Sequence, residues 1–206
     1  MVRGLYAVTP ESDDTAMLVR QVSAALDGGV RLVQYRSKNT SAARRIEHAR
    51  ALKALCSSRG AALIVNDYLE LALEVDAEGV HLGAGDGSAS AARQALGPHK
   101  LVGISCYDSL GRARAAVREG ADHVAFGSFF ASRVKPGAVQ APIALLERAS
   151  AELQVPIVAI GGITSENGRA LVAAGADALA VITALFDAPD IAAAAARFAP
   201  LFGPRR

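Results

Sequence analysis

The stretch "EGADHVAFG" (residues 119–127) contains a glycine that can end a helix, an aspartate suited to a turn, and a run of strand-forming residues. The stretch "AGADALAVI" (174–182) repeats this order, and "DAEGVHLG" (76–83) is a looser copy. A glycine allows a helix to end in a left-handed conformation, so each copy predicts the passage from a helix into a buried strand. The chain is therefore expected to consist of repeated helix–strand units.

The same alternation extends over the whole chain. Runs rich in branched apolar residues predict eight strands, at residues 5–9, 31–36, 62–66, 79–83, 101–105, 123–128, 156–161 and 178–183. Segments of helical period lie between them, such as 14–27, 41–58, 110–119 and 143–153, and the Ala-rich stretch 191–198 completes the set. Eight such units favour an α/β fold, a single (β/α)8 TIM barrel over residues 1–206, because an open doubly wound sheet usually has fewer strands.

Composition and charge narrow the class of protein. Hydrophobic residues make up 51% of the chain but aromatic residues only 5%, so Ala, Val and Leu must build the core. The net charge of +2 gives no electrostatic reason to expect a nucleic acid or an anionic membrane as a partner. No signal region and no membrane-spanning apolar stretch is seen, and Cys56 and Cys106 lie outside any CxxC motif. We expect a cytoplasmic protein with free thiols and small-molecule substrates.

In a barrel of this kind, active-site groups follow the carboxyl ends of the strands. The second strand reads "VQYRSK" (33–38), and a period of two places Gln34, Arg36 and Lys38 on one side while Val33 and Tyr35 face the helices. An arginine and a lysine at the barrel mouth could bind phosphate. The alternative is a surface pair at the end of a strand.

The third strand ends with the pair Asn66–Asp67 in "LIVND" (63–67), and Asp86 follows the fourth strand. Adjacent strands lie about 4.8 Å apart, so the two carboxylates could approach one point. Two carboxylates together with phosphate oxygens suit Mg²⁺, which binds few protein ligands. The alternative is that Asp67 caps the helix "YLELALEV" and Asp86 caps a helix beginning near Ser88.

Further polar groups follow the fifth and sixth strands. Ser105 ends the fifth strand and could donate a hydrogen bond to a phosphate oxygen. The sixth strand leads into "FFASRVKPGA" (129–138), which contains Ser132 and Lys135. Long loops in compact domains are more often functional than idle, so this loop is a candidate for substrate binding.

The last two strands predict a second anion site. Gly161 and Gly162 after the seventh strand would let backbone N–H groups approach an anion, helped by the start of the following helix. The eighth strand ends at Ile182–Thr183, in the region where such barrels often bind phosphate. A diphosphate–Mg²⁺ site on one side and a monophosphate site on the other suggest a transferase with two phosphorylated substrates.

Other chemistries have little support in the sequence. No Ser-His-Asp or Cys-His arrangement is evident, and the histidines at 48, 81, 99 and 123 are too scattered to suggest zinc. His81 is expected on the fourth strand as a packed or hydrogen-bonded residue.

The order and spacing of these motifs resemble the thiamine-phosphate synthase family, from "GLYAVT" to "AVIT" over nearly the whole chain. The motifs that carry the resemblance are "VQYRSK", "LIVNDYLELALEVDAEGVHLGAGD", "VGISC", "GADHVAFGSFFASRVKPGA" and "VPIVAIGGITSENGRALVAAGADALAVI". The resemblance implies a barrel that joins hydroxymethylpyrimidine diphosphate to a plain or carboxylated thiazole phosphate. The products would be thiamine phosphate and pyrophosphate, together with CO2 if the thiazole is carboxylated.

The resemblance also implies roles for individual residues. The diphosphate substrate would contact Gln34, Tyr35, Arg36, Ser37, Lys38, Asn66, Ser105 and Lys135, of which Arg36, Lys38, Ser105 and Lys135 would be catalytic. Asp67 and Asp86 would bind Mg²⁺. The thiazole phosphate would contact Ser132, Arg133, Val134, Gly162, Ile182 and Thr183.

The sequence departs from the family pattern at three places. Ser132-Arg133-Val134-Lys135 replaces the usual Thr-x-Thr-Lys, Ala84 replaces a frequent Gln, and Thr183 replaces a common Ser. These changes affect the thiazole-phosphate half and leave the diphosphate–metal half intact. A thiazole tautomerase-like enzyme and a non-catalytic thiazole-phosphate-binding regulator are the alternatives, and exposed apolar helix faces leave a homodimer open.

Overall fold

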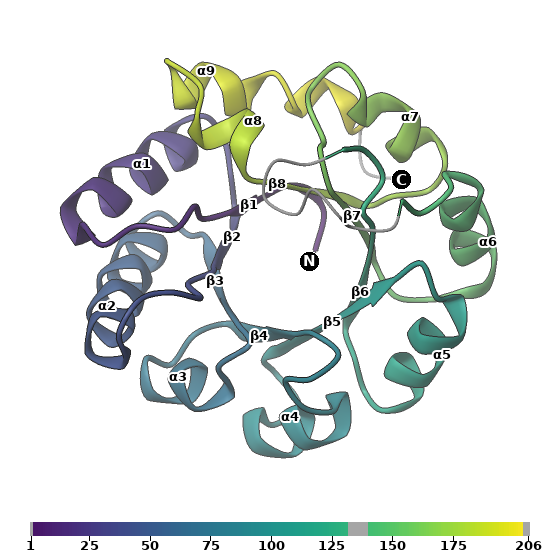
Figure 1. The fold of residues 1–206 in the computed structure, drawn as a ribbon, viewed down its shortest axis with the longest axis horizontal. Coiled ribbons are helices and arrows are strands. Elements are labelled where there is room, and N and C mark those ends of the chain that lie inside the picture. Colours follow the sequence, from purple (N-terminus) through teal and green to yellow (C-terminus); the bar gives the residue numbers. More distant parts are fainter. Residues whose placement is uncertain (1, 132–139, 204–206) are drawn as a thin grey trace.

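The computed structural model describes residues 2–131 and 140–203. Eight parallel strands close into a barrel in the order β1 to β8, and helices surround it (Figure 1). The strands are β1 (Gly4–Val8), β2 (Leu32–Tyr35), β3 (Ala62–Asn66), β4 (Gly79–Leu82), β5 (Leu101–Tyr107), β6 (His123–Phe126), β7 (Ile157–Ile160) and β8 (Ala178–Val181). Pairing of β1 with β8, which aligns Gly4 with Ala178, closes the barrel.

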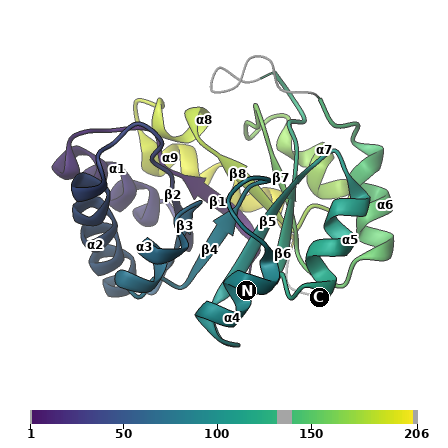
Figure 2. The same ribbon diagram turned by 60° about the horizontal axis from the view of Figure 1, so that its bottom comes forward.

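The helices occupy the connections that the sequence assigned to them. They are α1 (Thr15–Asp27), α2 (Ala42–Ser58), α3 (Leu69–Glu74), α4 (Ala89–Leu96), α5 (Leu110–Arg118), α6 (Ala144–Glu152), α7 (Gly168–Ala173), α8 (Thr183–Phe186) and α9 (Ile191–Ala196), followed by the 3-10 turn Ala199–Leu201. In the side view, α1 to α3 lie on one side of the strands and α5 to α7 on the other (Figure 2). The predicted TIM barrel is confirmed.

Local capping explains where several helices begin. The side chain of Asp14 accepts a hydrogen bond from the Met17 N–H at the start of α1, and Ser41 accepts one from the Arg44 N–H at the start of α2. Such caps satisfy backbone donors that have no partner inside the helix. The boundaries of α1 and α2 therefore fall within one residue of the predicted ones.

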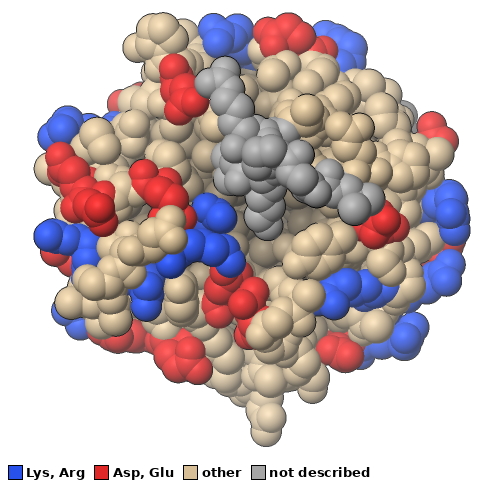
Figure 3. All heavy atoms as spheres, in the orientation of Figure 1, with Lys and Arg blue, Asp and Glu red and all other residues tan. Residues whose placement is uncertain are grey.

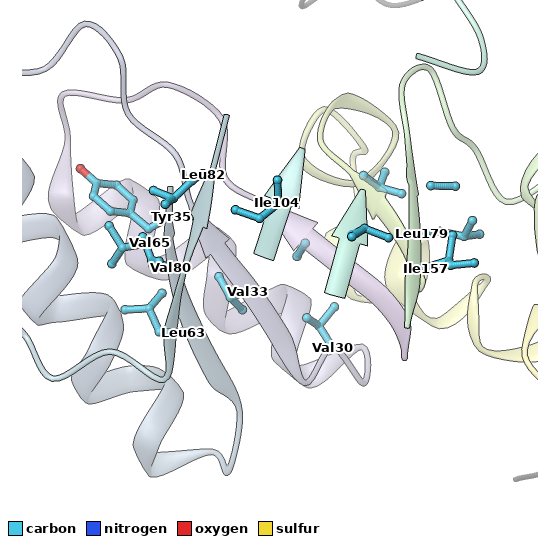
Figure 4. Packing of buried hydrophobic residues seen from close by; sticks show 14 of the residues in the cluster. Val30, Val33, Tyr35, Leu63, Val65, Val80, Leu82, Ile104, Ile157 and Leu179 are labelled. Carbon is cyan, nitrogen blue, oxygen red and sulfur yellow. The ribbon is translucent and has the colours of Figure 1, made fainter. Parts of the chain in front are cut away.

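The alternation of each strand separates two groups of side chains. Outward-facing residues such as Val33, Leu63 and Val80 pack against the helices and form the larger apolar cluster (Figure 4). Inward-facing residues such as Val8 and Ile64 form a smaller cluster inside the barrel. Since both faces of each strand are covered, the strands read as nearly continuous apolar runs in the sequence.

The interior of the barrel also contains polar side chains. Gln34, Asn66, His81 and His123 are all buried and come from four different strands. Burying polar groups in a core has a free-energy cost unless hydrogen bonds satisfy them, so their concentration there indicates a functional region.

Two further expectations can be compared with the structure. Cys56 and Cys106 are buried and form no disulfide, as predicted. Among the helices of the described ranges, none is both long and apolar enough to cross a membrane.

Candidate active site

A cavity of about 490 Å³ opens at the carboxyl ends of the strands. One side of it is polar and is lined by Gln34, Arg36, Asn66, His81 and Ser105. The opposite side is lined by the glycine turn after β7, by Ile182 and Thr183 after β8, and by apolar residues of β7 and β8. In the space-filling view, acidic and basic side chains gather beside the central hollow, on the side of β2 to β4 (Figure 3).

The end of β2 is held by residues that follow β1. The Arg36 backbone N–H donates to Thr9 Oγ1 at 3.0 Å, and the Lys38 backbone N–H donates to Glu11 Oε1 at 2.9 Å. The Arg36 guanidinium also donates to Glu11 Oε1, at 3.1 Å. Glu11 thus fixes both cationic residues at the mouth of the barrel.

The side chains of Tyr35 and Ser37 do not line the cavity, in contrast to those of Gln34 and Arg36. The Tyr35 side chain lies on the outer face of β2, where its hydroxyl is 3.1 Å from His48 Nδ1 on α2 (Figure 4). This agrees with the predicted alternation and leaves only the Tyr35 backbone near the mouth. Ser37 is buried, and its hydroxyl has no hydrogen-bond partner among the described residues.

The end of β3 presents Asn66 and Asp67 to the mouth. Asp67 has a left-handed backbone (φ 64°), and its N–H donates to the His81 carbonyl at 2.9 Å. A non-glycine residue in this conformation is uncommon, and aspartate tolerates it better than most residues do. The turn leaves one Asp67 carboxylate oxygen 2.7 Å from Lys38 Nζ.

Neither metal-ligand candidate caps a helix. Tyr68 precedes α3 without a side-chain cap, and the Ser88 hydroxyl caps α4, so the alternative roles as caps are wrong. Asp86 instead accepts a hydrogen bond from the Gly83 N–H at 2.9 Å. Because the β4–α4 loop folds back on itself in this way, the Asp86 carboxylate lies beside that of Asp67.

The two carboxylates are neighbours, as expected. Burial is the largest effect that raises the pKa of Asp86. Asp67 raises it further, through a side-chain hydrogen bond and through its negative charge, whereas the ammonium of Lys38 lowers it. The described residues contain no cluster of three or more His, Cys, Asp or Glu side chains suited to a metal. A pair of carboxylates with few other protein ligands suits Mg²⁺, which completes its coordination with waters and substrate phosphates. The residues present therefore fit this ion.

Ser105 lies on β5 at the edge of the cavity and contacts a histidine. The distance from its hydroxyl oxygen to His81 Nε2 is 3.0 Å. His81 in turn contacts His123 of β6, with 3.4 Å between His81 Nδ1 and His123 Nε2. Burial lowers the pKa of His81 to about 4, and burial with the charge of His81 lowers the pKa of His123 to about 3. Both imidazoles are neutral at pH 7.

The two glycines of the turn after β7 adopt backbone angles that favour glycine. Gly161 and Gly162 have φ values of 107° and 61°, and both line the cavity together with Ile182 and Thr183. The expectation that a helix starts directly after this turn is wrong, since α7 begins only at Gly168. The helix that begins at the mouth is α8, at Thr183.

Four predicted substrate-binding residues, Ser132, Arg133, Val134 and Lys135, lie outside the described residues. The structure therefore places ten of the fourteen predicted substrate-binding residues and both predicted metal ligands. Of those ten, seven line the cavity: Gln34, Arg36, Asn66, Ser105, Gly162, Ile182 and Thr183.

Reasoning from the sequence did not identify some residues at the mouth of the barrel. Glu11 pairs with Arg36, and Tyr6 inside the barrel receives a hydrogen bond from Gln34 Nε2 at 3.0 Å. Glu11 could have been found as an acidic residue just after the first strand. Tyr107 also lines the cavity, but its left-handed backbone (φ 54°) next to a register shift between β5 and β6 has no clear signal in the sequence.

The chain is similar to known proteins over nearly its whole length. A family model described as thiamine monophosphate synthase matches residues 5–185. The chain is 53% identical to the thiamine-phosphate synthase of Aromatoleum aromaticum, covering 98% of this chain and 97% of the relative. It is 55% identical to that of Thiobacillus denitrificans, covering 97% and 94%.

Solved structures agree with these relatives. The thiamine phosphate pyrophosphorylase from Pyrococcus furiosus superposes with a TM-score of 0.85 and is 32% identical, covering 96% of this chain and 94% of that chain. The resemblance inferred from the motifs is thereby confirmed, and the chain belongs to the thiamine monophosphate synthase family.

Proposed function

We propose that the residues at this mouth carry out the condensation of 4-amino-2-methyl-5-(diphosphooxymethyl)pyrimidine with a thiazole phosphate or its carboxylated form. Membership of the family assigns the chain a transferase activity in thiamine biosynthesis, with thiamine phosphate as the product. One observation carries the assignment of the site. A single cavity is lined by Arg36, Gln34 and Asn66 on one side and by a glycine turn on the other, and the ion pair of Lys38 with Asp67 lies next to Asn66 in the chain.

The cationic side binds the diphosphate. Arg36 lines the cavity, and Lys38 lies beside it, paired with Asp67. An arginine fork and a lysine ammonium neutralise the negative charge that develops as the pyrophosphate leaves. Loss of one such contact typically slows turnover by a factor of roughly 10² to 10³. Gln34 and Asn66, which are buried at the same side, contact the pyrimidine ring.

Asp67 and Asp86 hold Mg²⁺ in this proposal. When bound, the ion supplies further positive charge to the oxygens of the leaving diphosphate. The Lys38 ammonium pairs with Asp67 in the structure, so an ion held by Asp67 would compete for that carboxylate and would leave the ammonium free to pair with the diphosphate. Before the substrate binds, the positive charge of Lys38 offsets part of the negative charge of Asp67 and Asp86.

The glycine side binds the thiazole phosphate. Gly161 and Gly162 line the cavity with a positive φ at positions where an added Cβ would overlap Ser128 or Ala131, and Thr183 adds a hydroxyl at the start of α8. Such turns bind anions through successive backbone N–H groups. Ser132 to Lys135 retain the roles expected from the sequence.

No covalent intermediate on a cysteine is proposed. Burial raises the pKa of both Cys56 and Cys106 to about 12, so neither thiol is ionised at neutral pH. The electron-rich aminopyrimidine supports the positive charge left by the departing pyrophosphate, and the thiazole nitrogen attacks that carbon. A carboxylated thiazole in addition releases its carboxyl group as CO2. The protein binds, orients and shields the two substrates. A cytoplasmic location and an arrangement as a homodimer complete the proposal.

The test is a synthesis assay with the purified chain, both substrates and Mg²⁺, in which thiamine phosphate is detected as fluorescent thiochrome after oxidation. We expect product that disappears with EDTA and returns with added Mg²⁺. No product from either form of the thiazole, with the protein folded, would contradict the proposed reaction. Product that is unaffected by EDTA would contradict the metal site alone.

A further inference from the structure

Three polar side chains on neighbouring strands form a line from the cavity into the barrel. Ser105 and His81 line the cavity, whereas His123 is fully buried and does not. The Ser105 hydroxyl oxygen lies 3.0 Å from His81 Nε2, and His81 Nδ1 lies 3.4 Å from His123 Nε2. The second of these is a long hydrogen bond. The cavity is thus connected to a buried group that does not line it.

The interior of the barrel is shaped around this pair of imidazoles. Gly103 of β5 faces both rings, and a Cβ atom at this position would overlap ring atoms of His81 and His123. The ring of Tyr6 packs against the edge of His123, with 6.2 Å between centroids and 68° between planes. The two rings are therefore held in place by their packing, and the His81–His123 contact is a fixed feature of the core.

The hydrogen-bond partners of His123 decide which way the line of hydrogen bonds runs. His123 Nδ1 is buried and has no partner among the described residues. A neutral imidazole has one N–H and one unprotonated nitrogen. If Nδ1 carried the proton, a buried donor would be left unpaired, and such N–H groups are rarer than unpaired acceptors. The proton of His123 therefore belongs on Nε2.

We infer that His123 Nε2–H donates to His81 Nδ1, that His81 Nε2–H donates to Ser105, and that the Ser105 hydroxyl consequently donates into the cavity. The lowered pKa values of both histidines keep each ring neutral and support this pattern. His123 is thus a positioning residue, since it reaches the substrate only through His81 and Ser105. This inference rests on the proposed function in one respect, which is that the acceptor in the cavity belongs to the pyrimidine diphosphate.

The opposite direction would have a different chemical meaning. A serine that donates to a neutral histidine is the arrangement that activates a nucleophile. With His81 as the donor, Ser105 has no base and acts as a hydrogen-bond donor to a ring nitrogen or a phosphate oxygen. The direction of these hydrogen bonds therefore separates a binding role of Ser105 from a nucleophilic one.

The direct test is ¹⁵N NMR of the histidine side chains in the substrate-free protein, which distinguishes protonated from unprotonated ring nitrogens. The chain has four histidines, so the variants His123→Gln and His81→Gln assign the signals of these two rings. We expect His81 and His123 both to be protonated at Nε2. A proton on Nδ1 of either ring would overturn the inference. This readout needs no turnover, so it stands apart from any failure of the proposed reaction.

Kinetics of matched variants test the functional consequence. His123→Gln can place an amide N–H near the position of Nε2, whereas His123→Asn reaches only the position of Nδ1. We expect His123→Phe and His123→Asn to lower kcat/KM for the pyrimidine diphosphate by about tenfold, and His123→Gln to recover most of it. Equal losses in His123→Gln and His123→Asn would contradict the inference.

A double-mutant cycle separates positioning from a general loss of packing. In a Ser105→Ala background, His123→Phe should change kcat/KM by less than about twofold, because the hydroxyl that it orients is gone. Losses that multiply in the double variant would overturn the role through Ser105. If His123→Phe fails to fold, the comparison of His123→Gln with His123→Asn in the same background decides.

Discussion

Lys38 Nζ lies 2.7 Å from a carboxylate oxygen of Asp67, although the two residues end different strands. The hydrogen bond with Asp67 raises the pKa of Lys38. Burial lowers this pKa by less, and the negative charges of nearby carboxylates raise it further. The contact places a cation of the proposed diphosphate site directly on a proposed metal ligand. Metal binding and the position of this lysine must therefore be linked.

Replacing Lys38 should have opposite effects on metal binding and on catalysis. In Lys38→Met, Asp67 no longer pairs with an ammonium, so Mn²⁺ used as a probe for Mg²⁺ should bind the substrate-free protein more tightly. Turnover should fall by roughly 10² to 10³, because the diphosphate loses a cation. Mn²⁺ titration by EPR and steady-state kinetics measure the two effects. Weaker Mn²⁺ binding in the variant would show that Lys38 does not compete for Asp67.

Asp86 should make the Mg²⁺ requirement depend on pH. Its pKa is raised by burial and by Asp67, and only the ionised carboxylate binds the metal. As pH falls, Asp86 should therefore take up a proton at a higher pH than an ordinary aspartate, whose pKa is about 3.9. We expect the Mg²⁺ concentration for half-maximal activity to rise as the pH is lowered toward the raised pKa of Asp86. A requirement that stays constant down to the lowest pH at which the protein is folded would contradict Asp86 as a ligand.

The two buried histidines should destabilise the fold in acid. Their pKa values are lowered to about 4 and about 3, while an unfolded histidine has a pKa of about 6.5. Below about pH 6.5 the unfolded chain binds more protons than the folded chain, so stability is full above that pH and is lost as pH falls toward the folded pKa values. Each histidine contributes a slope of up to about 1.4 kcal/mol per pH unit.

Urea unfolding at several pH values in this range measures that slope. The variant His123→Gln lacks one of the two groups, so its free energy of unfolding should fall less steeply with pH than that of the wild type. The comparison of slopes cancels other titrating groups that the two proteins share. Equal slopes would mean that His123 does not remain neutral in the folded state.

The glycine turn after β7 should tolerate no side chain. In Gly162→Ala the new Cβ would overlap the carbonyl oxygen of Ala131, and we expect the KM for the thiazole phosphate to rise by about tenfold or more. Gly60→Ala is the matched control, because Gly60 has a φ of 62° against 61° for Gly162 but has no atom within 4 Å of an added Cβ. Steady-state kinetics of both variants make the comparison. Equal KM values would remove the turn from the thiazole-phosphate site.

The strands and their inward-facing residues were predictable because a period of two and a repeated helix–strand unit are local properties. The strand β3 was predicted with its observed bounds, and Gln34 and Tyr35 lie on the expected faces. Contacts between the ends of different strands were harder to predict from the sequence. The pairing of Glu11 with Arg36 joins two loops, and nothing in either loop specifies it.

The two histidines inside the barrel are a second case in which a local pattern predicts the position of a residue but not its contacts. Alternation places His81 and His123 inside the barrel, but the contact between them depends on the stagger of adjacent strands. The first residue of α7 was not predicted from the sequence. The turn after Gly162 continues through Asn167, whose side chain accepts a hydrogen bond from the Thr164 N–H and donates one to the Gly162 carbonyl. Such side-chain bonds delay a helix without leaving a pattern in its periodicity.

The most direct test of the proposed site is the rate of thiamine phosphate synthesis as a function of Mg²⁺ concentration in Asp67→Asn and Asp86→Asn. The control Asp13→Asn removes the same charge from an exposed position ahead of α1. We predict that both site variants lose at least about 10²-fold in turnover while their urea unfolding stays close to wild type, and that the control behaves as wild type. Near-normal turnover and an unchanged Mg²⁺ requirement in Asp67→Asn and Asp86→Asn would contradict the assignment of the metal to this carboxylate pair.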